Sequence, residues 1–142
     1  MGVELEHHFI GAEQSIDGCF DLIHLGHVRY LQKARSLGDL LVVGLNTDGS
    51  VRRLKGPSRP VVGEKSRAEV LAALECVDYV TLFGDATPER LIRRIKPDVL
   101  VKGGDWKTKD IVGRKLAKKI IRVQLLPDLS TTSLIDKIRS AQ

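Results

Sequence analysis

Two histidines, His24 and His27, stand three residues apart on either side of Gly26. Apolar residues recur at helical spacing just after them, so the pair comes where a helix begins. The start of a helix offers unpaired N–H groups and a partial positive charge, and both favour a bound phosphate. Imidazoles beside it add donors that can follow charge as it builds on a reacting phosphoryl group. The alternative is that both rings only pack or cap, but the rest of the chain favours phosphate chemistry.

Several common catalytic patterns are missing from the sequence. There is no Gly-x-Gly-x-x-Gly and no Gly-x-x-x-x-Gly-Lys-Ser/Thr, so neither a dinucleotide fingerprint nor a P-loop is expected. No Ser/His/Asp or Cys/His set indicates a covalent nucleophile. The neighbours of Cys19 favour a backbone bend over an activated thiolate.

The composition describes an ordinary globular chain. Its 142 residues suit one domain, with 42% hydrophobic and 29% charged residues. No signal peptide and no apolar run long enough to cross a bilayer occurs, and two cysteines without a CxxC indicate neither a disulfide scaffold nor a zinc site. A cytoplasmic location is expected. The net charge of +5 is spread along a chain with few aromatic residues, so we expect small anionic substrates rather than nucleic acid or a membrane.

Strand and helix signals alternate after an N-terminal tail, residues 1–12, in which Leu5-Glu6-His7-His8 resembles a remnant of an expression tag. The alternation predicts an α/β fold: a single domain over 13–142 with a Rossmann-like parallel five-stranded sheet and helices on both faces. The first strand, over Glu13 to Asp17, is unusually polar for a central parallel strand. The remaining strands are expected at 40–45, 79–83, 99–101 and 120–126. The helices are expected at 28–37, 64–75 (beginning at Glu64), 88–96 after a Thr87 cap, 111–119 and after Ser130, with a polar loop at 46–63.

Polar segments follow the predicted strand ends, where ligands of parallel sheets bind. Ser130-Thr131-Thr132-Ser133 precedes the last helix and offers a second anion cradle, or a Ser133-x-x-Asp136 capping box. Lys102-Gly103-Gly104-Asp105-Trp106 lets a ligand approach the backbone closely, or forms a plain turn. Four cations within 52–60 suit a sugar phosphate or a polyphosphate. Asp21 and Asp48 are candidates for a sugar or ribose hydroxyl, or for turn caps.

On these motifs the chain resembles the nucleotidyltransferase superfamily with the HxGH signature, and within it the heptose 1-phosphate adenylyltransferase branch. The resemblance covers about residue 15 to the end. It implies transfer of AMP from ATP to D-glycero-β-D-manno-heptose 1-phosphate, giving pyrophosphate and ADP-heptose, a precursor of the lipopolysaccharide core. The acceptor would attack the α-phosphate in line, with no enzyme intermediate and with Mg²⁺ bound to the triphosphate rather than in a protein site.

The resemblance also implies roles for individual residues. The catalytic residues would be His24, His27 and Lys55. The residues that bind ATP would be Gly18, Cys19, Phe20, Gly26, Lys102, Gly103, Gly104, Trp106, Ser130, Thr131 and Thr132. The sugar phosphate would meet Asp21, Asp48 and Arg59.

Two alternatives stay open beside this assignment. One is another transferase of the superfamily, such as a glycerol-3-phosphate cytidylyltransferase. The other is a catalytically weak nucleotide-binding module, suggested by the polar first strand over Glu13 to Asp17. A homodimer is also left open.

Overall fold

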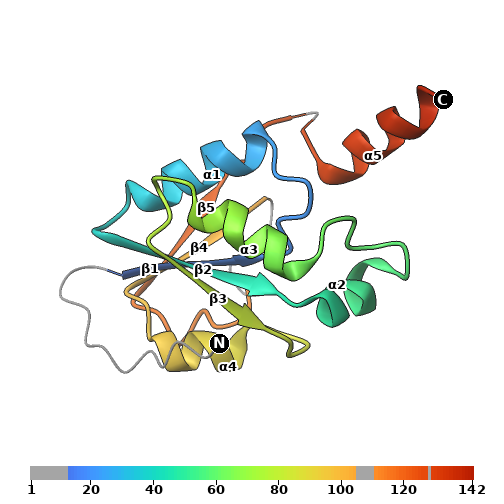
Figure 1. The fold of residues 1–142 in the computed structure, drawn as a ribbon. Helices are drawn as coiled ribbons and strands as arrows, with labels where there is room; N and C mark the ends of the chain where they lie inside the picture. Colours follow the sequence, from blue (N-terminus) through green and yellow to red (C-terminus); the bar gives the residue numbers. More distant parts are fainter. Residues whose placement is uncertain (1–12, 105–110, 128) are drawn as a thin grey trace.

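The computed structural model describes residues 13–104, 111–127 and 129–142, without the side chains of 13–17. Its centre is one parallel sheet with the strand order β3-β2-β1-β4-β5 (Figure 1). The strands are β1 (Glu13–Gly18), β2 (Leu40–Asn46), β3 (Tyr79–Phe83), β4 (Val99–Gly103) and β5 (Lys119–Val123). The α/β class predicted from the alternation of strands and helices is therefore confirmed.

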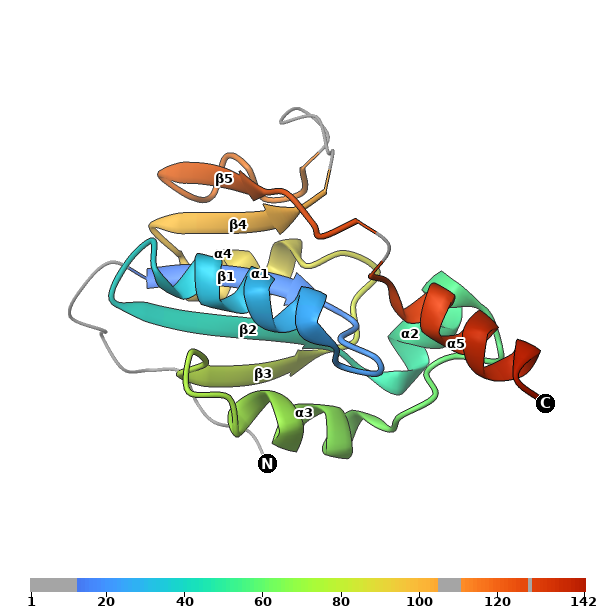
Figure 2. The same ribbon diagram turned by 90° about the horizontal axis from the view of Figure 1, so that it is seen from above.

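Helices cover both faces of this sheet. They are α1 (Leu25–Arg35), α2 (Asp48–Lys55), α3 (Glu64–Ala72), α4 (Glu89–Ile95) and α5 (Thr131–Ser140). α1 and α3 lie on one face and α4 on the other, whereas α5 projects past the edge where the strands end (Figures 1 and 2). Within the described ranges, no helix has the length and apolarity that crossing a membrane requires.

The core forms on both sides of the sheet. Leu31 of α1 and Leu71 of α3 are fully buried in one cluster with Leu41, Val43 and Leu45 of β2. Ile92 of α4 forms a second cluster with Leu100 and Ile111. The uninterrupted burial of β2 from its second residue onward confirms the strand predicted from a continuous apolar run.

The polar segment after β2 was predicted to be a loop, but it contains α2. The Thr47 side chain caps this helix by accepting the N–H of Ser50, and Asp48 lies in the first turn. Basic residues in the last turn complement the helix dipole, and Gly56 ends the helix with a φ of 100°. Only Ser50 and Val51 of this helix are buried, so the sequence shows no apolar stripe that would have revealed it.

The predicted helix over 111–119 is wrong. Residues 111–118 form turns, and Lys119 already starts β5. Gly113 has a φ of 83°, and a Cβ there would lie 2.6 Å from Ile92 Cδ1. A left-handed glycine packed this closely on α4 interrupts any helix.

Other predicted boundaries need smaller corrections. α3 ends at Ala72, earlier than the predicted 75, and β5 ends at Val123, earlier than 126. Pro88, rather than Thr87, occupies the N-cap position of α4. The polar segment Glu13–Gly18 does form a central strand, since it pairs with β2 on one side and β4 on the other.

Candidate active site

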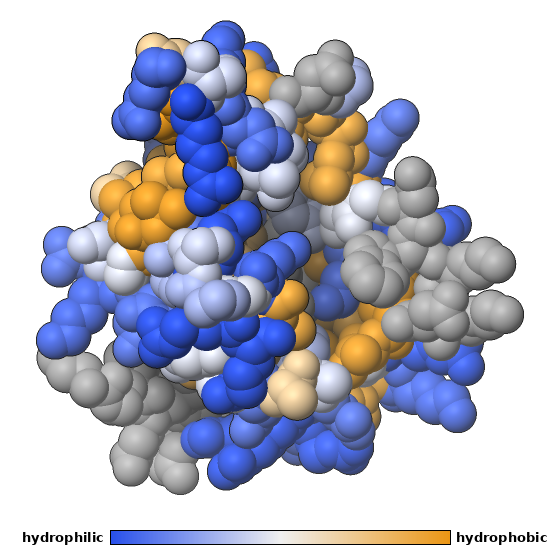
Figure 3. Space-filling model, turned by 90° about the vertical axis from the view of Figure 1, so that its right-hand side faces the viewer, coloured by the Kyte–Doolittle hydropathy of each residue, from blue (hydrophilic) through white to orange (hydrophobic). Residues whose placement is uncertain are grey.

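Two adjoining cavities lie at the carboxyl ends of the strands, on the face that Figure 3 shows hollowed near its middle. We name each cavity after a residue that lines that cavity and not the other. They are the Thr87 cavity, of about 530 Å³, and the Thr131 cavity, of about 610 Å³. Both are lined by Gly18, Cys19, Phe20, His27, Tyr30, Asn46, Leu54, Lys55 and Leu125. These shared residues make the two cavities parts of one site.

Each of the two histidines uses one ring nitrogen to cap the start of α1. His24 is the N-cap, and its Nδ1 accepts the backbone N–H of Gly26 at 3.0 Å. The Nδ1 atom of His27 accepts the backbone N–H of His24 at 3.2 Å. Because a nitrogen that accepts carries no proton, we assign the proton of each neutral ring to Nε2. Each imidazole therefore keeps one N–H donor for a ligand, and both rings line the Thr131 cavity.

Both imidazoles are neutral at physiological pH. Burial lowers the pKa of His24 below its usual value. Burial, and secondly the neighbouring His24, lowers the pKa of His27 to about 4, against an opposing effect of Asp21. The pair can thus donate hydrogen bonds to a phosphoryl oxygen without carrying a full charge of its own.

Gly26 is needed between the histidines for a steric reason. A Cβ at this position would lie 2.7 Å from Cε1 and 2.9 Å from Nδ1 of His24. The His24 ring folds back over the first turn of α1 and fills the space of that missing side chain. The His-x-Gly-His spacing is therefore a packing requirement of the double cap.

The loop between β1 and α1 has a strained backbone. Phe20 and Leu22 have φ values of 47° and 51°, a left-handed conformation that is unfavourable for residues with a side chain. The ring of Phe20 is buried against Gly18, and its centroid lies 5.5 Å from that of His27. Burial raises the pKa of the Cys19 thiol, so Cys19 is not an activated nucleophile.

Asp21 holds a neighbouring loop. Its buried carboxylate accepts Arg59 Nε and the N–H of Val61 at Oδ2, each at 2.9 Å, and the N–H of Val62 at Oδ1 at 3.0 Å. Burial alone would raise the pKa of Asp21, but the two backbone donors and Arg59 lower it below its usual value. The carboxylate thus performs the turn-holding role weighed above, while Arg59 reaches the Thr131 cavity.

Asp48 was predicted to meet the sugar, but the structure does not bring it to either cavity. Its Oδ1 pairs with Arg67 at 2.7 Å. Arg67 is a residue that our sequence analysis missed, as it missed the cavity-lining Tyr30 and Thr87, and its side chain is only 1% exposed. One signal could have found it: Arg67 precedes Leu71 by one helical turn, on the buried stripe of α3.

The four serines and threonines at the start of α5 have different roles. Ser130 and Ser133 form a capping box, in place of the Ser133–Asp136 box weighed above. Thr131 Oγ1 donates to the backbone oxygen of Asp21, which fastens the start of α5 to the loop before α1. Among these four described hydroxyls, only that of Thr132 has no recorded protein partner, and it lines the Thr131 cavity.

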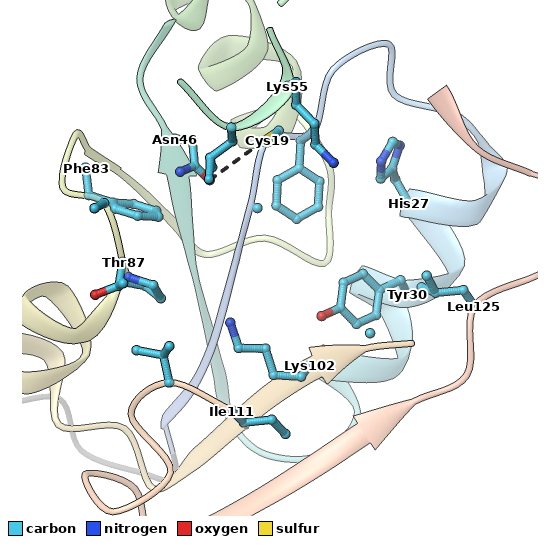
Figure 4. Close-up of a pocket in the computed structure, with 17 residues that line it drawn as sticks. Cys19, His27, Tyr30, Asn46, Lys55, Phe83, Thr87, Lys102, Ile111 and Leu125 are labelled. Atoms are coloured by element: carbon cyan, nitrogen blue, oxygen red, sulfur yellow. Dashed lines mark hydrogen bonds between the residues drawn. The ribbon is translucent and has the colours of Figure 1, made fainter. Parts of the chain in front are cut away.

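The remaining predicted residues lie mainly around the Thr87 cavity (Figure 4). Lys55 and Lys102 extend toward it from different sides, and His27 lies across it from Thr87. Gly103 also lines it, and a Cβ there would lie 2.8 Å from Leu125 Cδ2. Gly104 adopts a φ of 90°, which favours glycine. Trp106 lies outside the described residues.

Comparison with known proteins identifies the family of the chain. Residues 15–137 match the family model described as Cytidylyltransferase-like. The chain is 54% identical over 123 residues to the Bifunctional protein HldE of Helicobacter pylori (strain J99), covering 87% of this chain and 27% of that protein. It is 55% identical over 128 residues to the protein of the same name from Geotalea uraniireducens (strain Rf4), covering 87% and 26%. The chain thus spans about a quarter of the length of these curated relatives.

A solved structure is similar over almost its whole length. The crystal structure of the lipopolysaccharide core biosynthesis protein from Thermoplasma volcanium GSS1 matches with a TM-score of 0.70 and 30% sequence identity. The match covers 82% of this chain and 98% of that one. The family predicted from the HxGH segment is therefore confirmed, and the chain belongs to the cytidylyltransferase-like family.

Proposed function

We propose that the chain is an adenylyltransferase that transfers AMP from ATP to D-glycero-β-D-manno-heptose 1-phosphate, giving ADP-heptose and pyrophosphate. The observation that carries this proposal is the pair of neutral Nε2–H donors of His24 and His27, beside two joined cavities. The solved relative named for lipopolysaccharide core biosynthesis supports a sugar of that core as the acceptor.

The reaction needs charge stabilisation rather than a covalent nucleophile. An oxygen of the sugar phosphate forms a bond to the α-phosphorus of ATP, and the bond from that phosphorus to the α–β bridging oxygen breaks. The electron pair leaves with pyrophosphate. Two donors aimed at the α-phosphate stabilise its developing charge, and a single donor of this kind contributes roughly 10²–10³-fold to turnover.

In an in-line reaction the acceptor and the leaving group lie on opposite sides of the reacting phosphorus, and we assign one cavity to each. The start of α5, the Thr132 hydroxyl and Arg59 line the Thr131 cavity and suit the anionic leaving group. We assign the acceptor to the Thr87 cavity. There Lys55 and Lys102 suit the sugar phosphate, and Asn46 and Thr87 suit sugar hydroxyls.

This arrangement replaces the predicted sugar contacts of Asp21 and Asp48, whose carboxylates bind Arg59 and Arg67. It also moves Lys102 and Gly103 from ATP to the acceptor, and Arg59 from the sugar to the leaving group, because of the cavities that they line. The predicted contacts of Gly104 and Trp106 with adenosine remain part of the proposal. In the described part of the chain, no cluster of His, Cys, Asp and Glu side chains suits a metal ion. As the resemblance implies, Mg²⁺ would bind to the triphosphate and offset its charge.

The test is pyrophosphate release from the purified protein with Mg²⁺. ATP and CTP are each combined with heptose 1-phosphate, glycerol 3-phosphate or no acceptor. Release only with ATP and heptose 1-phosphate is the expected result, and release with CTP and glycerol 3-phosphate would favour the cytidylyltransferase alternative. Stabilisation by ATP in a melting experiment, without release from any pair, would indicate a nucleotide-binding module.

A further inference from the structure

Arg67 is a buried cation whose guanidinium makes four hydrogen bonds to the protein. Its Nε donates to the backbone oxygen of Val62 at 2.8 Å. Its Nη1 donates to the backbone oxygens of Cys19 at 2.7 Å and Asn46 at 2.9 Å. Its Nη2 pairs with Asp48 at 2.7 Å. One side chain on α3 therefore binds three carbonyl groups that are far apart in the sequence.

Each of these carbonyl groups belongs to a segment that lines the candidate active site. Cys19 begins the loop that leads to the two histidines of α1. Asn46 ends β2 and lines both cavities. Val62 follows Arg59, a cation of the Thr131 cavity, and its N–H is bound by Asp21. The guanidinium thus fixes the relative positions of three site segments without reaching either cavity.

The loop before α1 needs such support. Its left-handed residues Phe20 and Leu22 keep their conformation only where neighbours impose it. Arg67 binds the carbonyl of Cys19, directly before Phe20, and Phe20 packs beside His27. The hydrogen bonds of Arg67 therefore act on the backbone that places the two imidazoles.

The hydrogen bonds of Arg67 stabilise the fold as well as holding the three segments, because a buried carbonyl group left without a donor costs free energy. The stripe of α3 that carries Arg67 continues with the fully buried Leu71. Buried ion pairs often contribute no more to stability than a well-packed apolar residue does. An apolar residue would fill this space, but it could not bind three carbonyl groups at once.

We propose that Arg67 is a positioning residue, which fixes the loop before α1 so that His24 and His27 aim their Nε2–H groups at the reacting phosphate. The identity of the reaction rests on the proposed function. The role of Arg67 in placing the two imidazoles does not depend on which reaction is catalysed, and it can be measured on the protein without substrates.

The first experiment records ¹⁵N NMR spectra of the imidazoles in the wild type and in Arg67→Lys near neutral pH. A lysine ammonium cannot reproduce the planar fork of donors. The wild type should show His27 as a single Nε2–H tautomer, and Arg67→Lys should show averaging with the other tautomer. Leu71→Ala is the matched control, because it removes a buried side chain one turn further along α3 and leaves the three loops alone. It should lower the melting temperature yet keep the wild-type tautomer.

The second experiment measures pyrophosphate release per folded molecule. Arg67→Lys should lower kcat by roughly 10- to 100-fold, because small misplacements of reacting groups have effects of this size. The KM for ATP should change less than kcat does, and Leu71→Ala should keep the wild-type kcat. Should Arg67→Lys fail to fold, Asp48→Asn replaces it, since it removes the charge opposite Nη2 while Arg67 stays. Asp48→Asn should change the tautomer population and kcat in the same direction as Arg67→Lys, but to a smaller extent.

Unchanged tautomer and kcat in a folded Arg67→Lys or Asp48→Asn protein would overturn the proposal. So would equal losses in Leu71→Ala, since the role would then be structural only. A wild type that releases no pyrophosphate with any substrate pair would refute the proposed function, while the tautomer comparison would still decide the role of Arg67.

Discussion

The Nδ1 atom of His27 lies 3.2 Å from the backbone nitrogen of His24, and the centroids of the two rings are 4.0 Å apart. With the bond from Gly26 to His24 Nδ1, this contact makes the start of α1 a reciprocal cap built from two imidazoles. Our sequence analysis weighed capping against phosphate binding. The two roles use different nitrogens of each ring, so capping leaves both Nε2–H donors in place.

Replacement of His24 should separate these two roles. Asparagine is a good N-cap but has no donor at the position of Nε2, whereas alanine supplies neither. Both His24→Asn and His24→Ala should lower turnover by roughly 10²–10³-fold. Only His24→Ala should also lower the free energy of unfolding, by about 1 kcal/mol. Pyrophosphate release and urea unfolding of both variants measure the two effects.

The comparison contradicts our assignment if His24→Asn keeps wild-type turnover, since the ring would then serve only as a cap. A His24→Ala variant as stable as the wild type would show that the Nδ1 contact does not stabilise the helix.

The low pKa of His27 predicts how stability depends on pH. The pKa is about 4 in the folded protein, against an ordinary value of 6.5. Between these values the unfolded chain binds more protons than the folded one, so stability rises with pH. The contribution of His27 is therefore complete above about pH 6.5 and is lost as the pH falls toward about 4. His24, whose pKa is also lowered, acts in the same direction.

Urea unfolding of the wild type and His27→Gln at several pH values in this window measures the effect. The free energy of unfolding should fall less steeply with decreasing pH in His27→Gln than in the wild type. Parallel curves would show that His27 titrates normally in the folded protein.

The sequence predicted elements well where burial is strong. The apolar run of β2 is the strand expected, because a strand covered on both faces must be apolar throughout. The edge strand β3 was also predicted, although only its last residue is buried. The helix α2 was missed because its polar surface hides the periodicity, and its cap, Thr47, was not recognised. The helix predicted over 111–119 does not form, because Gly113 is left-handed and packs against Ile92. No local sequence pattern reveals this contact.

The same distinction holds for the candidate site. The HxGH segment and the Ser130–Thr132 segment were found because their residue types are local signals, and both line one cavity. The partners of Asp21 and Asp48 could not be found in this way. Arg59 and Arg67 lie 38 and 19 residues away along the chain, and only the fold brings each pair together.

Gly26→Ala should disrupt the double cap. The added Cβ would lie 2.7 Å from the His24 ring, so that ring must leave its position over α1. We expect a loss of turnover similar to that of His24→Ala. Gly49→Ala in α2 is the control, because its Cβ would meet only the end of the Arg53 side chain, at 3.6 Å. Since alanine favours a helix interior over glycine by roughly 0.5–1 kcal/mol, Gly49→Ala should keep activity without loss of stability. Full activity of Gly26→Ala would refute the packing requirement.

The two threonines at the start of α5 should affect the reaction differently. Thr132 is proposed to donate its hydroxyl to the leaving group, so Thr132→Val should raise the KM for ATP by roughly tenfold, the effect of one hydrogen bond to a charged group. Thr131 already donates to the backbone oxygen of Asp21. Thr131→Val should therefore lower stability by about 1 kcal/mol and reduce kcat, because the loop before α1 loses its contact with α5. Steady-state kinetics with varied ATP, together with urea unfolding, separate the two effects. A larger KM effect in Thr131→Val than in Thr132→Val would show that the phosphates meet the first hydroxyl instead.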